Sequence, residues 1–319
     1  MINWIYGFVL LLLFVLENIY FKIAKKYNIL DVPNERSSHH TITLRGGGVI
    51  FYFGVLIYEL VFGFFAPWFV CGLTLVALIS FIDDMNPLSA KIRLLVQAFS
   101  LLLLLLQLGV HEVACGYVVL SLFFGLAILN IYNFMDGING ITGGYSLVVL
   151  CALGYVNMQV VPFVDEGMIY TMILAVVVFN VFNFRRKAKC FAGDVGSVSI
   201  AFVILFLLGK LILETGDWSY IIFLVVYGVD SVLTIIHRLM LHENIGLPHR
   251  KHMYQLMANE LKIPHVVVSL IYMAVQSVVI IGYIDCLDHG YIFLLCTVLL
   301  LSFIYIWFMR KFFRLHQNA

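Results

Sequence analysis

Long apolar segments alternate with short polar segments along the chain. A helix that spans a bilayer needs about 20 mostly apolar residues, and by that measure the pattern predicts eleven spanning helices. They lie at residues 3–23, 46–65, 67–82, 92–109, 114–132, 142–161, 167–184, 197–214, 219–236, 265–284 and 291–309. The sequence therefore predicts an all-α integral membrane protein, a polytopic bundle of about 11 transmembrane helices that forms one domain over residues 1–319.

The composition agrees with this fold class. The chain is 63% hydrophobic and 12% charged, whereas soluble domains are about 25% charged, so disorder and nucleic-acid binding are excluded. The six cysteines form no CxxC motif and most lie in apolar segments, where we interpret them as small hydrophobic residues. Ile5–Leu16 has neither a basic leader nor a small-residue cleavage site, so we expect it to be retained as a helix.

The polar segments fall into two groups, because successive spans connect opposite sides of the membrane. Of the 19 Lys and Arg residues, 18 lie in or beside one group, and only Lys210 lies toward the other. The positive-inside rule then predicts that the basic group is cytoplasmic, with the N-terminus outside and the C-terminus in the cytoplasm. This group comprises residues 24–45, 83–91, 133–141, 185–196, 237–264 and 310–319.

The segment Asn130-Ile-Tyr-Asn-Phe-Met-Asp-Gly-Ile-Asn-Gly140 lies where one long apolar segment ends and another begins. It carries Asn130, Asn133, Asp136 and Asn139 among hydrophobic residues. Asn, Asp and Gly are common in ordinary turns, so a plain helix connection is one interpretation. Since a turn needs fewer polar groups than this, we expect a packed loop that holds these side chains in place.

Paired acids end the third predicted span. Asp83 and Asp84 are followed by Lys91 and Arg93. Adjacent carboxylates at a membrane border must be solvated, paired or bound to a cation, and Mg²⁺ prefers carboxylate, water and phosphate oxygens. We interpret the segment as a metal and phosphate site, and the simpler alternative is a charged helix end followed by a turn.

The segment Phe191-Ala-Gly-Asp-Val-Gly-Ser197 precedes another span. Its Gly193 and Asp194 stand where a helix begins, and free backbone N–H groups at a helix start can bind phosphate. A carboxylate there would reach a phosphate through a metal ion. The alternative is that the helix dipole alone favours Asp194.

Basic residues gather in Pro248-His-Arg-Lys-His-Met-Tyr-Gln255. A zinc site is disfavoured because neither a Cys nor a third His lies at ligand spacing. Arg binds phosphate oxygens through two parallel hydrogen bonds, so His249, Arg250 and His252 are interpreted as an anion clamp. Positive charge that only sets topology is the alternative. The first loop, Asp31–His40 and Arg45–Gly48, gives weak support alone, since its glycines can serve only as a flexible helix start.

Together these segments suit metal-assisted transfer of a phosphoryl-linked group. The alternative is a transporter or flippase for a phosphorylated or lipid-linked solute, which would place polar groups near the bilayer midplane. Glu17, Glu59 and Asp230 are the candidates at that depth, and as isolated groups they form no pathway. Asp230 is open to a second interpretation as a contact between helices.

The motifs resemble those of the polyprenyl-phosphate N-acetylhexosamine-1-phosphate transferase superfamily, glycosyltransferase family 4. The resemblance covers residues 31–255 and preserves the motif order. It implies a multi-pass enzyme of the bacterial inner membrane with a cytoplasmic active site. Such an enzyme uses Mg²⁺, or alternatively Mn²⁺, to transfer an N-acetylated hexosamine-1-phosphate from a UDP-sugar to undecaprenyl phosphate. It releases UMP, and its product initiates a cell-envelope polysaccharide.

The resemblance also implies roles for particular residues. Asn139 departs from the pattern, because many bacterial members have a second Asp there, although an amide can still bind a uracil edge. The triple-His form of the peptidoglycan branch is absent, so the chain resembles the O-antigen, capsule and teichoic-acid branch. The implied catalytic residues are Asp83, Asp84 and Asp136, the metal-site residues are Asp194 and Asn133, and the substrate-binding residues are Asn139, Lys91, Arg93, Gly193, His249, Arg250 and His252.

Two features stay open at this point. The sugar can be GlcNAc or a 6-deoxy N-acetylated hexosamine, so the expected soluble partner is a UDP-N-acetylhexosamine without further detail. The expected lipid partner is undecaprenyl phosphate in the bilayer, and no nucleic acid is expected. Both a monomer and a homodimer are compatible with the sequence.

Overall fold

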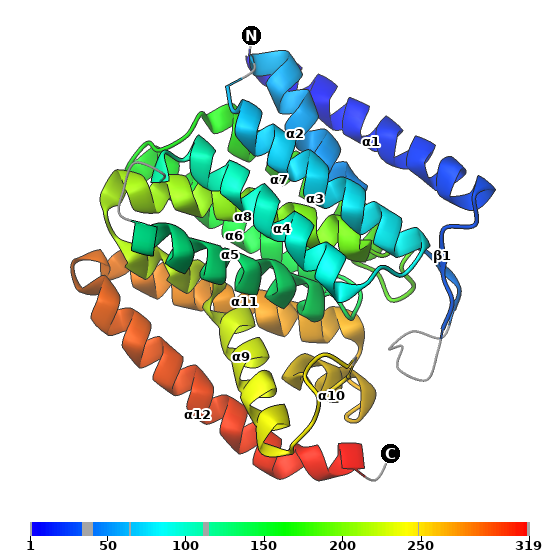
Figure 1. The fold of residues 1–319 in the computed structure, drawn as a ribbon, viewed down its shortest axis with the longest axis vertical. Helices are drawn as coiled ribbons and strands as arrows, with labels where there is room; N and C mark the ends of the chain where they lie inside the picture. The colour runs from blue at the N-terminus through cyan, green and yellow to red at the C-terminus, as the bar shows by residue number, and fades with distance from the viewer. Residues whose placement is uncertain (1, 34–40, 64, 111–114, 248, 318–319) are drawn as a thin grey trace.

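A computed structural model describes residues 2–33, 41–63, 65–110, 115–247 and 249–317. Residues 34–40 of the first loop and Pro248 lie outside this part of the chain. The described residues form a helical bundle with one pair of two-residue strands (Figure 1). The elements are α1 (Ile2–Lys26), β1 (Leu30–Asp31), β2 (Thr43–Leu44), α2 (Val49–Phe62), α3 (Pro67–Met85), α4 (Ala90–Gln107), α5 (Cys115–Met135), α6 (Ile141–Gln159), α7 (Glu166–Asn183), α8 (Gly193–Thr215), η2 (Trp218–Leu224), α9 (Val225–Met240), α10 (Met253–Asn259), α11 (His265–Asp285), η3 (Leu287–His289) and α12 (Gly290–Gln317).

Ten helices of the described part are long and apolar enough to cross a membrane, which confirms the polytopic all-α fold. The predicted second span, 46–65, differs, because α2 has only 14 residues. At 1.5 Å per residue it is about 21 Å long, shorter than a hydrocarbon core of about 30 Å. Gly63, at φ 120°, ends the helix, and the Phe65 N–H donates to the Glu59 carboxylate (2.8 Å), which stabilises the exit.

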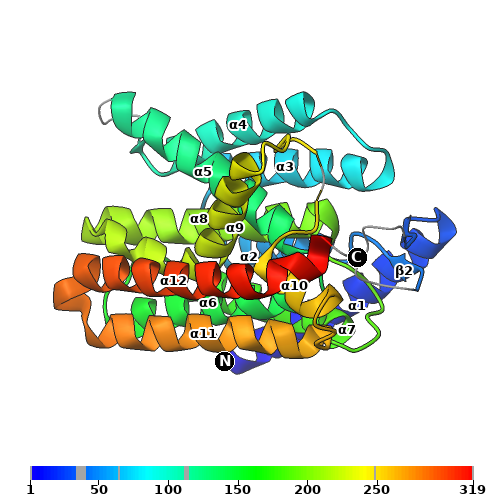
Figure 2. The same cartoon turned by 90° about the horizontal axis from the view of Figure 1, so that it is seen from below.

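The helix α8 runs through the centre of the bundle. Its sequence is apolar on all sides, and a helix of that kind is stable only when it is surrounded. Figure 2 shows α3, α4 and α5 on one side of it and α6, α7 and α11 on the other. Phe69 of α3 stacks on Phe206 of α8 with ring centroids 4.2 Å apart. This packing fixes the start of α8, which carries Asp194, at the middle of one end of the bundle.

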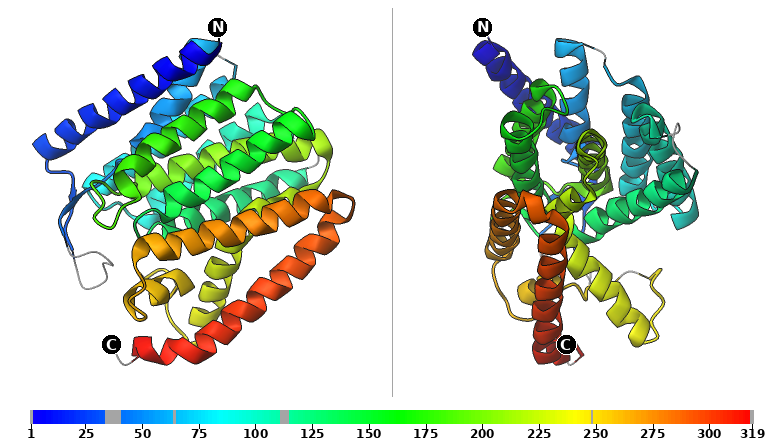
Figure 3. Two further views of the ribbon diagram at one scale, coloured as in Figure 1. Left: turned by 180° about the vertical axis from the view of Figure 1, so that it is seen from behind. Right: turned by 90° about the vertical axis from the view of Figure 1, so that its left-hand side faces the viewer.

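The outer helices have a different character. α1 and α12 lie at opposite edges (Figure 3), and α12 exposes Leu299, Phe303 and Trp307, as lipid-facing helices do. The span predicted at 219–236 consists of two parts, the 3₁₀ helix η2 and the α-helix α9. Gln276 of α11 secures their junction, because it donates to the Ile222 carbonyl (3.0 Å) and accepts from the Val226 N–H (3.2 Å).

Alternating helix directions bring the motif-bearing loops to one end of the bundle. We call it the motif end; it comprises residues 27–33, 41–48, 86–89, 136–140, 184–192, 241–247 and 249–264. There β1 pairs antiparallel with β2, and Leu44 bridges to Cys190 just before α8. The sequence pattern predicted neither these strands nor α10. All three are too short to show a periodic apolar pattern.

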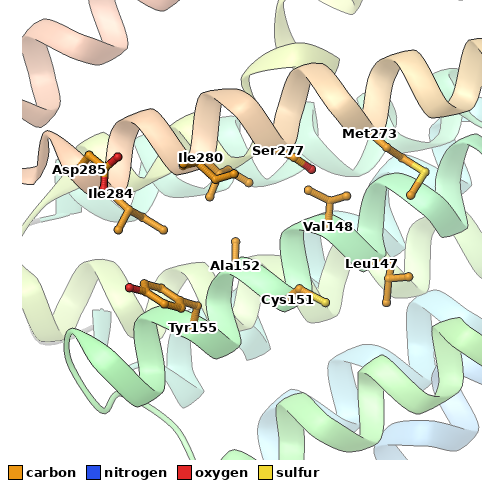
Figure 4. Close-up of a pocket in the computed structure, with 11 residues that line it drawn as sticks. Leu147, Val148, Cys151, Ala152, Tyr155, Met273, Ser277, Ile280, Ile284 and Asp285 are labelled. Carbon is orange, nitrogen blue, oxygen red and sulfur yellow. The ribbon is translucent and has the colours of Figure 1, made fainter.

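An open pocket of about 570 Å³ lies between α6 and α11, away from the motif end (Figure 4). Its walls are largely apolar, including Leu147, Cys151 and Ile280, and Asp285 lies where α11 finishes. The ionisable side chains in its lining are Cys151, Tyr155 and, at one end of the pocket, Asp285. A pocket with so few ionisable groups does not suit a nucleotide. The polar chemistry of the molecule therefore lies elsewhere, at the motif end.

Candidate active site

Three carboxylates from two helices meet at the motif end. Asp83 and Asp84 lie in the last turn of α3, and Asp194 lies in the first turn of α8. Arg93 joins two of them through one nitrogen: its Nη1 donates to Asp83 Oδ2 at 2.8 Å and to Asp194 Oδ2 at 3.0 Å. Arg93 and Asp194 are 101 positions apart in the chain. The packing of α3 and α4 beside α8 is therefore what creates this cluster.

Asp84 organises the first turn of α8. Its side chain is fully buried, and its Oδ1 accepts from the Asp194 N–H (2.9 Å) and lies 2.7 Å from Arg45 Nε. Its Oδ2 accepts from the Val195 N–H (3.0 Å). These two N–H groups are the ones that a helix start would offer to a phosphate. In this structure both N–H groups already donate to Asp84. A phosphate near Gly193 would therefore have to bind other donors, and the contact of Gly193 with substrate stays a prediction.

Arg45 belongs to the cluster, although no role was predicted for it. Besides its contact with Asp84, its Nη2 lies 3.5 Å from Asp194 Oδ1. The glycines that follow make this approach feasible, because the Gly48 N–H donates to the Ala192 carbonyl (3.0 Å) and a Cβ on Gly48 would collide with Gly196. The Arg-Gly-Gly-Gly motif can be read from the sequence, but the sequence does not show that this motif packs against the start of α8.

The prediction of a packed loop over 130–140 is only partly right, because α5 continues to Met135 and only residues 136–140 form the loop, while Asn130 and Asn133 lie in the last turns of the helix. Asn133 donates from Nδ2 to Ser197 Oγ (3.2 Å), which places it beside the first turn of α8. Asn130 instead donates to Gln97 Oε1 (3.3 Å) and so joins α5 to α4. Burial raises the pKa of the Asp136 carboxyl to about 7. A carboxyl that titrates near neutral pH suits proton transfer.

Asn139 is buried and positions a neighbouring loop. Its Nδ2 donates to the carbonyls of Arg185 (2.9 Å) and Arg186 (3.2 Å). Asn183 works with it: its Oδ1 accepts from the Gly140 N–H (2.7 Å), and its Nδ2 donates to the Cys190 carbonyl (2.9 Å). Sequence reasoning missed Asn183, because a single Asn at the end of an apolar helix forms no motif. The predicted nucleotide contact of Asn139 stays a prediction.

Residues 249–252, which we call the basic loop, lie against the end of α5, close to the loop 136–140. Tyr254 donates from its hydroxyl to the Phe134 carbonyl (2.9 Å), two residues before Asp136. The His252 ring lies 6.4 Å from the Phe134 ring and 5.0 Å from the His249 ring, between centroids. The structure thus brings His249 and His252 close to the 130–140 segment, as expected from their predicted common side of the membrane.

In the basic loop, the surroundings of His249 and Lys251 set the charge of the first and the ion pair of the second. Burial and the neighbouring positive groups His252 and Arg238 lower the pKa of His249 to about 3. Its Nδ1 accepts the Lys251 N–H (3.3 Å), so the neutral ring carries its proton on Nε2 and can donate it to an anion. The Lys251 ammonium pairs with Glu243, whose pKa this hydrogen bond lowers.

The other basic candidates differ in their surroundings. Arg250 is half-buried in the same loop, whereas Lys91 is exposed at the start of α4. Arg93, two positions after Lys91, is the residue of that pair that reaches the acids. The two residues therefore form a natural test pair on one helix turn.

One observation indicates that Asp83 and Asp194 suit a divalent cation. Among the described residues no group of three or more His, Cys, Asp and Glu side chains forms a ready metal site. However, Asp83 Oδ2 and Asp194 Oδ2 converge on a single cationic nitrogen of Arg93. Two carboxylate oxygens that share one positive centre are the donors that Mg²⁺ prefers. The oxygen ligands therefore suit Mg²⁺, with Arg93 now balancing their charge.

Fold and site together define a polytopic membrane protein with a carboxylate and arginine cluster at one end of its bundle. The family model described as glycosyl transferase family 4 matches residues 66–212, which contain Asp83, Asp84, Asp136 and Asp194. This match bears out the family resemblance over residues 66–212, which is just under half of the chain. The basic loop lies beyond this region.

Individual proteins show the same similarity. The undecaprenyl-phosphate alpha-N-acetylglucosaminyl 1-phosphate transferase of Escherichia coli (strain K12) is 28% identical over 207 residues, 59% of this chain and 56% of that protein. The Yersinia pestis protein of the same name is 29% identical over 206 residues. The probable undecaprenyl-phosphate N-acetylglucosaminyl 1-phosphate transferase of Bacillus subtilis (strain 168) is 26% identical over 278 residues, 80% of this chain and 77% of that protein. The matches with the Escherichia coli protein thus span just over half of its length.

Proposed function

We propose that the protein transfers an N-acetylated hexosamine-1-phosphate from a UDP-sugar to undecaprenyl phosphate, with Mg²⁺ as the metal. An oxygen of the lipid phosphate attacks the sugar-bearing phosphorus of the UDP-sugar. The bond from that phosphorus to the bridging oxygen breaks, and UMP leaves. The product is a lipid-linked pyrophosphoryl sugar that initiates a cell-envelope polysaccharide. The names of the similar proteins support both the lipid acceptor and an N-acetylglucosaminyl 1-phosphate donor.

The main support for this proposal is that Asp83 and Asp194 converge on Arg93 at the same end of the bundle as the basic loop. Asp83 and Asp194 would hold the Mg²⁺ ion, with Asn133 beside it. When bound, the ion supplies positive charge that offsets the charge of the pyrophosphate. Asp84 keeps Asp194 in place through the first turn of α8.

The remaining residues bind and orient the substrates. His249 presents an Nε2–H, and Arg250 supplies a guanidinium to the pyrophosphate, while Arg93 is close enough to the acids to contact a phosphate held there. The lipid phosphate is largely ionised at neutral pH, since phosphate monoesters have a second pKa of about 6. Asp136 therefore needs only to orient this phosphate or to accept its last proton.

The direct test is release of UMP by the purified protein. We expect UMP and a lipid-linked sugar to form only when a UDP-sugar, undecaprenyl phosphate and Mg²⁺ are all present, and a chelator to stop the reaction. A panel of UDP-GlcNAc and 6-deoxy N-acetylated UDP-sugars then identifies the donor. Absence of UMP with every donor would contradict the proposal and favour the transport hypothesis.

The proposal also requires the motif end to face the cytoplasm, where UDP-sugars are made. We expect single cysteines introduced at Lys187 and Lys251 in a cysteine-free variant to be shielded from impermeant reagents in intact cells. Cysteines at Glu166 and Asp288, at the opposite end of the bundle, should react. The distribution of 18 of the 19 basic residues is the reason. A shielded position 166 together with a labelled position 187 would reverse the assigned orientation.

A further prediction concerns the anion clamp. We expect Arg250→Ala to raise KM for the UDP-sugar and to lower kcat, by about tenfold or more in kcat/KM, because a charge-assisted contact to phosphate is lost. Arg250→Lys should recover only part, since an ammonium lacks the planar fork of a guanidinium. Lys251→Ala is the matched control, because Lys251 already pairs with Glu243. A larger effect in the control than in Arg250→Ala would show that the clamp is misassigned.

A further inference from the structure

Asp230 is a buried carboxylate that joins three helices near the motif end. It lies in α9 and is 2% exposed. From the first turn of α10 it accepts the N–H groups of Met253 (3.0 Å) and Tyr254 (3.4 Å). It also accepts the hydroxyls of Tyr272 in α11 (2.6 Å) and of Thr234 in α9 (3.2 Å). So many donors on one carboxylate hold it, and the loop it binds, in a single arrangement.

One more group faces Asp230, and it belongs to the basic loop. His252 Nδ1 lies 3.4 Å from Asp230 Oδ1, and both side chains are almost completely buried. Both ring nitrogens of His252 are buried and neither has a hydrogen-bond partner within the described part of the chain, so Nδ1 meets Asp230 as a charge contact and Nε2 faces no partner. A buried polar nitrogen without a partner is unfavourable unless a ligand binds it. The ring therefore faces a carboxylate at Nδ1, and its Nε2 has no protein partner among the described residues.

We propose that Asp230 is a positioning residue that fixes the His252 ring so that Nε2–H points to an anionic oxygen of the UDP-sugar pyrophosphate. This inference rests on the proposed transferase function and adds a residue outside the recognised motifs. The hydrogen bond at one ring nitrogen determines which proton the other nitrogen presents. When Nδ1–H faces Asp230 and Nε2–H faces the ligand, the ring is an imidazolium whose charge the carboxylate balances.

A purely structural role makes a different prediction. If Asp230 only caps α10, its loss would weaken the fold and reduce turnover whether or not His252 is present. If Asp230 acts through His252, its loss should matter only while the imidazole is there. A double-mutant cycle separates the two, because the coupling between residues appears as non-additivity.

The cycle uses Asp230→Asn, His252→Ala and the double variant of the full-length protein in detergent. Asn keeps an oxygen that can accept the Met253 N–H, so the fold should persist. We expect Asp230→Asn to lower kcat/KM for the UDP-sugar about tenfold or more in the otherwise unchanged protein, in the range seen when a partner that orients a histidine is removed. In the His252→Ala background the same change should cost less than twofold. Equal losses in both backgrounds would overturn the positioning role.

Gln276→Met provides the control for general damage. Gln276 lies one turn after Tyr272 in α11, is equally buried, and accepts from the Tyr145 hydroxyl (2.6 Å). Its substitution should lower the melting temperature while its effect on kcat/KM stays the same with and without His252. If Asp230→Asn does not fold, Tyr272→Phe removes a single hydrogen bond to Asp230 and should show the same dependence on His252 with a smaller factor.

The two levels of the proposal fail in different ways. If the wild-type protein releases no UMP from any UDP-sugar, the transferase function and this inference are both overturned. If the wild-type protein is active and Asp230→Asn is additive with His252→Ala, the function stands and only the role of Asp230 is overturned. Non-additivity in the Asp230 cycle together with additivity in the Gln276 cycle supports the inference.

Discussion

Asp194→Asn is expected to reduce sugar-1-phosphate transfer by at least about a hundredfold, the scale expected when charge stabilisation at a reacting phosphate is lost. Asp194 contributes one of the two oxygens that converge on Arg93, and its carboxylate lies at the start of the central helix. Asn keeps the shape and one oxygen but removes the charge that a divalent cation requires. The measurement is UMP release at saturating UDP-sugar, with matched amounts of membrane-inserted protein.

The control is another Asp→Asn change at a helix start. Asp217 caps η2 at the opposite end of the bundle, where its carboxylate accepts the Ser219 N–H (2.8 Å). Asp217→Asn should keep turnover within about twofold, since Asn is an equally good cap. Turnover of Asp194→Asn close to that of the wild type, at any Mg²⁺ concentration, would remove Asp194 from the metal site.

Arg93→Ala is expected to lower kcat/KM on the order of 10- to 100-fold, because it removes the guanidinium that pairs with Asp83 and Asp194 and that is close enough to contact a phosphate held there. The Arg93 side chain is 35% exposed, so water screens part of this effect. A single nitrogen, Nη1, makes both contacts, and one ammonium can replace one nitrogen. We therefore expect Arg93→Lys to stay within about tenfold of the wild type.

Lys91→Ala is the matched control for this prediction. It removes a positive charge from the same turn of α4, but from an exposed position. Its effect on kcat/KM should be small and should disappear at high salt, as expected for a screened surface charge. If Lys91→Ala and Arg93→Ala lose activity equally and both recover in salt, then only the overall positive charge of this segment matters, and the ion-pair cluster has no specific role.

The difference between Arg93 and Arg250 follows from geometry. Arg93 acts at one point between two oxygens, so the substitution by Lys is tolerable. Arg250 is proposed to bind a phosphate through both arms of its fork, so the same substitution should be costly. Measuring Arg93→Lys and Arg250→Lys side by side tests both assignments. The opposite order of residual activity would exchange their roles.

The sequence alone determined the membrane class, the positions of ten of the eleven predicted spans and the common side of the motif loops. This is because a spanning segment must satisfy its own backbone hydrogen bonds and expose apolar side chains to lipid, and both requirements are local. The long helices appear where the apolar segments lie. The exception is α2, whose length depends on the glycines around it and on Glu59, which accepts the Phe65 N–H.

Only the tertiary structure decided what the polar side chains do. Asp83 and Asp84 are adjacent in sequence, yet one contacts Arg93 and the other caps α8. Asp230 was compatible with a simple helix contact, and the structure shows a carboxylate that binds α10, α11 and His252. These roles depend on hydrogen bonds between residues far apart in the chain. Their distances are set by helix packing to within an ångström, which no local pattern of residues records.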